Sequence, residues 1–251
     1  MFFDPYGIMK VHESGTEVFV MKVKKIIATL LIIAAVCSFM PVISGATATT
    51  VSKKDMAKSL KNMGLLLNTN GMSKTLNRQD AYKLLVRGMG YARYAEYLKL
   101  KAAKENLKNH IKDTKKIKNG NAKSINYLYI NSAMRSSNKK IGANKKITGN
   151  YFSYSVLRLL GYKVRGKDKK IATEVLAKKC GLSKKRARQL ENKKLTKEDA
   201  VEILWYALHS KIEKDKMTQI EFLIEFELVS KFAAIKEGFI EDDINPVPEV
   251  V

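Results

Sequence analysis

The sequence predicts an all-α protein, in which three helix–loop–helix repeats form a pseudo-threefold helical bundle that is followed by a C-terminal helical tail. Three observations support this fold class. Apolar residues recur at the spacing of amphipathic helices through most of the chain. Alternating strand patterns bounded by turn signals are scarce. One pattern of helix start and apolar helix occurs three times, and such repeats decide a fold.

The individual helices follow from this periodicity. In the first, apolar side chains at Met56, Leu60, Met63 and Leu67 share one helical face. The predicted helices span residues 54–67, 79–100, 124–135, 150–160, 172–180, 184–192, 197–210 and 217–236. The intervening loops at 68–75, 136–147 and 163–170 are rich in Asn, Ser, Gly and Lys.

The repeat is clearest where each long helix begins. The three copies read Leu-Asn-Arg-Gln-Asp-Ala at 76–81, Ile-Thr-Gly-Asn at 147–150 and Leu-Thr-Lys-Glu-Asp-Ala at 195–200. Asn77 and Thr196 suit the N-cap position, and an acid three residues later suits the positive end of the helix. Gly90 and Gly161 stand where a C-cap glycine belongs. The unit therefore predicts a short helix, a polar loop and a long helix in each copy.

The N-terminal region has the organisation of a secretory signal peptide. Residues 21–25 are basic, 26–39 are apolar, and 46–48 read Ala-Thr-Ala, a typical cleavage site. The sequence predicts a signal peptide at 21–48, which leaves 1–20 as an extension from a start assigned too early. The alternative is a retained membrane anchor, which needs about 20 apolar residues. Val36 before Cys37 does not fit a lipoprotein box, so no lipidation is expected.

The charge is strongly positive and uneven. The chain holds 47 Lys and Arg against 24 Asp and Glu, a net charge of +23. Residues 99–170 carry 20 cations against three acids, whereas 213–251 carry four against ten. A chain this basic should bind a polyanion. The acidic tail could shield this basic block or increase solubility.

Composition argues against an enzyme or a metalloprotein. Two Cys and three widely spaced His provide neither a disulfide framework nor a metal cluster. No paired carboxylates, phosphate-binding glycine loop or Ser/His/Asp set stands out, so we expect no catalysis and no cofactor. Cys180 reads as a small core residue and His209 as a half-buried helix end. Tyr94 and Tyr97 share one helix side, which suits helix packing or base and sugar stacking.

The repeat pattern resembles the S-layer homology (SLH) domain family of bacterial wall-anchoring repeats. That family opens its second helix with a Thr-Arg-Ala-Glu-type motif and ends it in Leu-Gly-Leu or Leu-Gly-Tyr. The segments 77–80 and 196–199 are similar to the opening motif, and 159–162 to the ending. The copies span 52–92, 99–163 and 170–210, with 211–251 as an acidic tail. The aromatic Phe-x-Asp…Trp-Ala stretch of the family's first helix is absent.

The resemblance implies three repeats in a pseudo-threefold unit whose grooves hold a pyruvylated secondary wall polysaccharide. The motif arginine matches Arg78, and only Lys197 stands at the third repeat. A cation at a helix start, beside free backbone N–H groups, suits a carboxylate. We therefore predict a secreted protein of a Gram-positive-type bacterium that binds anionic wall polymer. Its predicted binding residues are Arg78, Lys197, Asp80 and Asp199, aided by the basic block.

A second interpretation concerns residues 175–192, which resemble the helix-turn-helix of small repressors. Its second helix would carry Lys184, Lys185, Arg186 and Arg188 toward phosphates and base edges. The net charge agrees with nucleic-acid binding. The predicted signal peptide and the repeat register favour the wall-binding interpretation instead.

Overall fold

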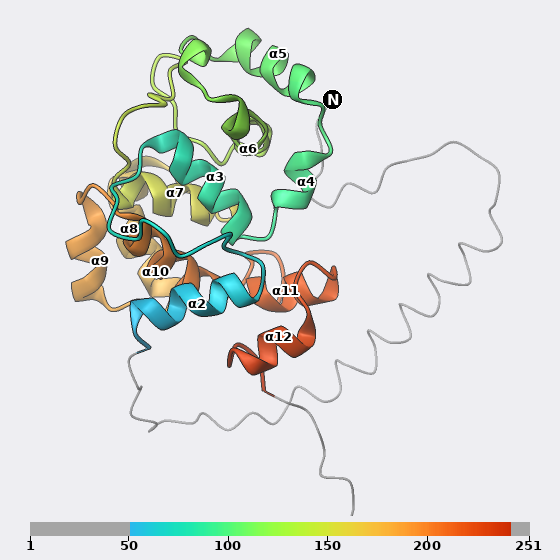
Figure 1. Cartoon of the computed structure of the whole chain (residues 1–251). Coiled ribbons are helices and arrows are strands. Elements are labelled where there is room, and N and C mark those ends of the chain that lie inside the picture. Colours follow the sequence, from blue (N-terminus) through green and yellow to red (C-terminus); the bar gives the residue numbers. More distant parts are fainter. Residues whose placement is uncertain (1–50, 242–251) are drawn as a thin grey trace, which may run out of the picture. The chain divides into compact units, whose positions relative to one another are not determined.

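Helices make up the regular structure of residues 51–241, the part of the chain described by the computed structural model (Figure 1). This part contains α-helices and two 3₁₀ helices but no β-strand, so the all-α prediction is confirmed. The predicted signal peptide at 21–48 and the extension at 1–20 lie outside the described residues. The α-helices are α2 (Lys53–Asn62), α3 (Arg78–Gly88), α4 (Ala92–Glu96), α5 (Leu100–His110), α6 (Asn119–Ile130), α7 (Gly149–Leu159), α8 (Ala172–Cys180), α9 (Lys184–Glu191), α10 (Lys197–Leu208), α11 (Gln219–Glu225) and α12 (Lys231–Lys236). The 3₁₀ helices are η1 (Thr114–Lys116) and η2 (Gly166–Lys169).

Two predicted helices are divided in the structure. The segment 79–100 breaks at Gly90, whose φ of +81° ends α3 as the predicted C-cap glycine. A Cβ at Gly90 would lie 2.2 Å from the Leu223 side chain, so glycine also permits close packing there. The segment 217–236 breaks after α11, where Glu227 has a φ of 55°. Helix α5 was not predicted.

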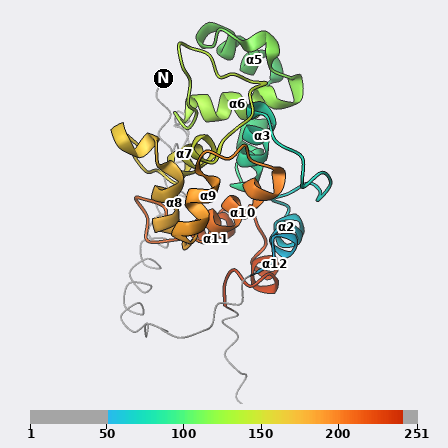
Figure 2. The ribbon, with the colours of Figure 1, turned by 90° about the vertical axis from the view of Figure 1, so that its left-hand side faces the viewer.

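Helix α2, the first described helix, packs against α10, the last of the long helices. Helix α3 packs on α6, α7 on α8, and α10 on α2. The first turns also touch: Gln79 accepts the backbone N–H of Lys118 at 2.8 Å, and Asn150 accepts that of Thr173 at 3.1 Å. In the α10–α2 pair, Lys53 of α2 likewise contacts the first turn of α10, at Glu198 and Asp199. Within residues 51–241, helices near the two ends of this part thus lie side by side, as Figure 2 shows for α2 and α10.

The segments that precede the long helices exchange backbone hydrogen bonds at the centre. The N–H of Leu76 donates to the carbonyl of Leu195 at 2.9 Å, Leu195 donates to Ile147 at 2.9 Å, and Ile147 donates to Leu76 at 3.2 Å. Ile147 and Leu195 are fully buried. This ring satisfies backbone groups that would otherwise be buried without partners.

The acidic tail is part of the folded unit up to Glu241. Gln219 of α11 is buried and its Nε2 donates to the carbonyl of Met89 at 3.0 Å. Asn62 of α2 donates to Glu237 at 2.7 Å. Both views place α12 at the end opposite α5, away from that part of the basic block (Figures 1 and 2). Within residues 51–241 no helix is long and apolar enough to span a bilayer.

Candidate functional site

Arg78 lies in the first turn of α3, with its guanidinium group against the loop that precedes α7. Its Nη1 donates to the carbonyl of Ile141 at 2.8 Å. The guanidinium carbon stands 4.0 Å from the ring centroid of Tyr151, a cation–π contact. The Nε of Arg78 is buried and has no hydrogen-bond partner among the described residues, which is a costly arrangement for a donor.

Arg135 brings a second guanidinium group to the same aromatic ring. Its guanidinium carbon lies 4.2 Å from the ring centroid of Tyr151 and 5.6 Å from that of Tyr154. A hollow of about 290 Å³ opens here, lined by Met134, Arg135, Ser136 and Tyr154. Arg135 lines this hollow and shares the Tyr151 ring with Arg78, and two neighbouring guanidinium groups favour an anion.

The loop beside Arg78 is held from its other side by Asp113. The carboxylate of Asp113 accepts the backbone N–H of Ile141 at 3.0 Å and that of Gly142 at 2.8 Å. Gly142 has a φ of +64°, and a Cβ there would come within 3.0 Å of the Arg78 Nη1. Glycine therefore lets Arg78 reach the loop, and Asp113 fixes the loop in position.

Lys197 occupies the same position in α10 as Arg78 does in α3, and it holds the loop that precedes α3. Its Nζ donates to the carbonyl of Asn68 at 2.7 Å, the side-chain oxygen of Asn68 at 3.1 Å and the carbonyl of Asn70 at 3.0 Å. Burial lowers the pKa of Lys197. An ammonium group has three N–H donors, and these contacts account for all of them.

Asp80 links α3 to α6. Its Oδ1 accepts the side-chain amide of Asn121 at 2.8 Å, and its Oδ2 accepts that of Asn77 at 2.8 Å. The Nζ of Lys118 stands 3.6 Å away. Asn77 in turn caps α3 by accepting the backbone N–H of Asp80, as predicted from the sequence. These contacts orient Asp80 toward a neighbouring helix start.

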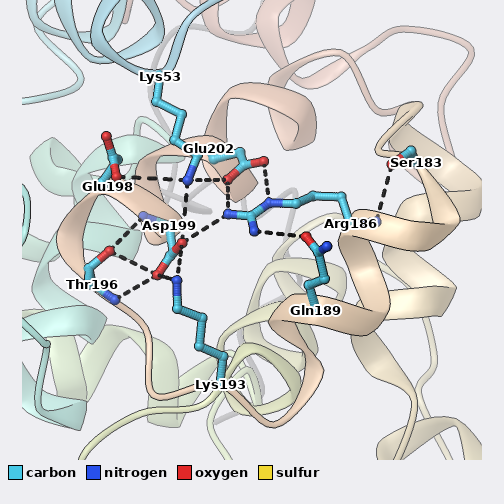
Figure 3. Close-up of polar contacts among 9 residues, drawn as sticks. All are labelled: Lys53, Ser183, Arg186, Gln189, Lys193, Thr196, Glu198, Asp199 and Glu202. Carbon is cyan, nitrogen blue, oxygen red and sulfur yellow. Dashed lines mark hydrogen bonds and ion pairs between the residues drawn. The ribbon is translucent and has the colours of Figure 1, made fainter.

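Asp199 lies in a buried ion-pair network, which Figure 3 shows between α2, α9 and α10. Its side chain is only 1% exposed, and it forms ion pairs with Arg186 at 3.0 Å, Lys193 at 2.9 Å and Lys53 at 3.6 Å. Thr196 and Asp199 also form a complete capping box. Burial alone would raise the pKa of Asp199, but the bonds from Lys193 and Thr196 prevail and lower it to about 2.

Glu202, one turn further along α10, completes this network. Its two carboxylate oxygens accept the Nε and Nη2 of Arg186 at 2.8 and 2.7 Å, a bidentate pair. Lys53 lies 3.3 Å from the same carboxylate. The network joins α2 to α9 and α10, which is a structural role.

The cations of the helix-turn-helix segment divide between the interior and the surface. Gly181, with a φ of +79°, ends α8, and Ser183 caps α9. Arg186 belongs to the buried network, and Arg188 stands 3.4 Å from Glu174. Lys184 and Lys185 are exposed. The two helices and their tight turn are present, but two of the four predicted contact residues, Arg186 and Arg188, pair with the molecule's own carboxylates.

Arg135, Tyr151 and Tyr154 are the site residues that sequence reasoning missed. Tyr151 occupies the position in α7 that Asp80 and Asp199 occupy in α3 and α10, so an alignment of the three copies would have revealed it. Arg135 lay unremarked within the basic block. Its proximity to Arg78 depends on the packing of α3 against α7, for which the local sequence carries no signal.

Comparison with protein-family models, with curated proteins and with solved structures found no match to this chain. The resemblance to S-layer homology repeats therefore rests on the residues quoted above. Within residues 51–241, no group of three or more His, Cys, Asp or Glu side chains is arranged to hold a metal ion.

Proposed function

We propose that the protein is a secreted, non-enzymatic surface protein of a Gram-positive-type bacterium, which binds anionic cell-wall polysaccharide. The observation that carries the proposal is the pair of guanidinium groups, Arg78 and Arg135, that share the ring of Tyr151, with Arg135 also lining an open hollow. A guanidinium group offers a planar fork of N–H donors that matches a carboxylate or a phosphate. Cell-wall polymers carry such groups along their length.

We further propose that residues 52–92, 99–163 and 170–210 are three repeats around a pseudo-threefold axis. The ring of hydrogen bonds through Leu76, Ile147 and Leu195 supports this arrangement, because each residue stands at the same place before its long helix. A second set of equivalent bonds supports it as well: the N–H groups at 78, 149 and 197 donate to the carbonyls at 145, 193 and 74.

The proposal assigns different roles to the four residues predicted from the motif. Arg78 binds the anionic group, with Arg135 added as its partner. Lys197 holds a loop with its three donors, while Asp80 and Asp199 join helices of neighbouring repeats. These three act as positioning residues, since their contacts are already made within the protein.

The test is cosedimentation of the full chain with purified wall sacculi, before and after extraction of the anionic polymer. Wild type should sediment only with intact walls. Arg78→Gln and Arg135→Gln should each weaken binding by about 10- to 100-fold, because a charged hydrogen bond contributes about 1.5–3 kcal/mol. Arg135→Gln leaves the bond between Arg78 and Ile141 in place, so it separates ligand binding from loop stability.

The matched control is Lys184→Gln with Lys185→Gln, which removes exposed charge from α9. This variant should sediment like wild type. If wild type fails to sediment with walls but binds duplex DNA, and the control variant loses that binding, the wall proposal is wrong. The helix-turn-helix interpretation of 175–192 would then replace it.

A further inference from the structure

Five aromatic rings form a continuous row that the anion site does not use. The row consists of Tyr97, Tyr94, Tyr91, Phe222 and Phe226. Successive ring centroids are 6.5, 6.3, 6.5 and 4.5 Å apart. The row joins α4 to α11, two helices that are more than a hundred residues apart in the sequence. We call it the aromatic row.

The middle of the row is supported from beneath. Tyr127 of α6 stacks on Tyr91 with centroids 5.5 Å apart and planes inclined by 26°. Gln219 fixes α11 to the end of α3 by donating to the carbonyl of Met89. The close contact of Gly90 with Leu223 adds to this junction. A preformed aromatic surface loses little conformational entropy when a ligand stacks on it.

The two ends of the row are open to solvent. Tyr97 is 73% exposed, Phe226 49% and Tyr94 37%. The Tyr94 and Tyr97 hydroxyls make no hydrogen bond within the described part of the chain. With about 200 Å² per aromatic side chain, these three rings expose about 300 Å². A stable dimer interface needs about 800 Å² per partner, so the exposed area of these rings is too small to hold a second copy of the chain.

The polar groups beside the row are of both signs. Arg93 and Lys99 flank the tyrosines in the chain, whereas Glu221, Glu225 and Glu227 flank the phenylalanines, and all five are exposed. Carboxylates accept hydrogen bonds from hydroxyl groups, and tyrosine hydroxyls both donate and accept them. Nucleic acid fits poorly, because its phosphates would meet the three glutamates.

We propose that the aromatic row binds the uncharged sugar rings of a wall polysaccharide. The C–H faces of pyranose rings stack on aromatic faces, and their equatorial hydroxyls reach the flanking carboxylates. The polymer's anionic groups would be held separately, by Arg78 and Arg135. This inference rests on the proposed wall binding for the source of its ligand, but its chemistry is independent of charge.

The test measures binding of a soluble chitin oligosaccharide, an uncharged probe, to the full chain by isothermal titration calorimetry and saturation-transfer NMR. Tyr94→Ala with Tyr97→Ala should weaken binding by about tenfold or more, because stacking on one aromatic ring is worth that much. Phe232→Ala is the matched control: Phe232 is 74% exposed and makes no ring contact within the described residues. Thermal unfolding checks that all variants fold.

The outcomes distinguish this inference from the proposed function. Oligosaccharide binding that is lost in the tyrosine variant and kept in Arg135→Gln supports the aromatic row. Wall sedimentation of wild type without any oligosaccharide binding overturns the row and leaves the anion site standing. Oligosaccharide binding without wall sedimentation overturns the wall proposal and leaves the row standing. Equal loss in the Phe232→Ala control shows that the effect is not specific to the row.

Discussion

The first residue of the long helix does not have the same role in all three copies. Arg78 and Lys197 both extend to carbonyls of a neighbouring loop, at Ile141 and at Asn68 respectively. At the corresponding position of α7 the chain has Gly149, because α9 passes too closely for a side chain. A Cβ there would lie 2.1 Å from the carbonyl oxygen of Leu190. The first helical position is thus occupied by a cation in two copies, and by a glycine in close contact with another backbone in the third.

Gly149→Ala should therefore destabilise the protein, because the added methyl group forces α7 away from α9. We expect a loss of about 1–3 kcal/mol in the free energy of unfolding, measured by urea denaturation. Gly120→Ala is the control, since Gly120 lies in the first turn of α6 and its Cβ would meet only the Lys83 Nζ at 3.5 Å. That variant should be neutral or more stable by up to about 1 kcal/mol. Equal effects of the two substitutions would contradict the packing argument.

Asp199 is the residue through which stability should depend most clearly on acid. Its pKa is lowered from 3.8 to about 2 in the folded protein, so the folded state favours the ionised form. The stabilisation is complete above about pH 4 and is lost as the pH falls through about 2. Asp199→Asn should cost about 3 kcal/mol at pH 7, and its deficit against wild type should shrink at pH 2.5. Urea denaturation at both pH values measures this.

Glu198→Gln provides the comparison for that experiment. Glu198 belongs to the same network, but its side chain is 42% exposed and stands 3.8 Å from Lys53. An exposed ion pair contributes well under about 1 kcal/mol. A pH-independent deficit in Asp199→Asn, or an equal deficit in Glu198→Gln, would refute the assigned role of Asp199.

At the scale of elements, periodicity predicted most of the helices but located some of them poorly: the helix predicted at 124–135 is observed as α6, Asn119–Ile130. Helix α8 was predicted with its observed bounds at 172–180, and α7 and α9 to within one residue at each end. The segment 79–100 was predicted as one helix because apolar spacing continues past Gly90, although the glycine ends α3. Helix α5 was missed because it is rich in lysine and its apolar stripe is narrow. Only Ala103 and Leu107 of this helix are buried.

A neutral histidine lies at the contact between the C-terminal end of α10 and the segment that follows α12. His209 stacks on Phe239 with centroids 4.6 Å apart, and its Nδ1 lies 3.0 Å from the carbonyl of Trp205. Burial lowers the pKa of His209 below its usual 6.5, against the smaller effect of that hydrogen bond. The contact is therefore fully stable above about pH 6.5 and weakens as the pH falls below it.

We expect backbone amides of α12 to exchange faster at pH 5 than at pH 7.5, after correction for intrinsic exchange rates, whereas those of α7 keep their protection. Hydrogen exchange followed by mass spectrometry resolves the two helices. In His209→Gln the corrected difference between the two pH values should disappear. A difference of the same size in that variant would assign the pH dependence to another group.

At the scale of the whole molecule, packing between separate segments brings the residues of the candidate site together. Arg78 was predicted from its motif, but Arg135 and Tyr151 come from the following copy and meet it only when α3 and α7 pack together. The sequence pattern shows which residues begin helices, but it does not show which copies pack against each other. The aromatic row is likewise assembled from α4, between the first two copies, and α11, which follows the third.

Two binding surfaces of different chemistry should respond differently to salt. If Arg78 and Arg135 hold anionic groups, and the basic block adds to the attraction, wall binding should fall at least tenfold between about 50 and about 500 mM salt, because the Debye length shrinks. Stacking of uncharged sugars on the aromatic row involves no ion pairing, so oligosaccharide affinity should stay within about twofold. Sedimentation and calorimetry at matched salt concentrations measure both. Wall binding that stays constant over this range would exclude the charge mechanism, and oligosaccharide binding that falls in parallel would show that the two surfaces are not independent.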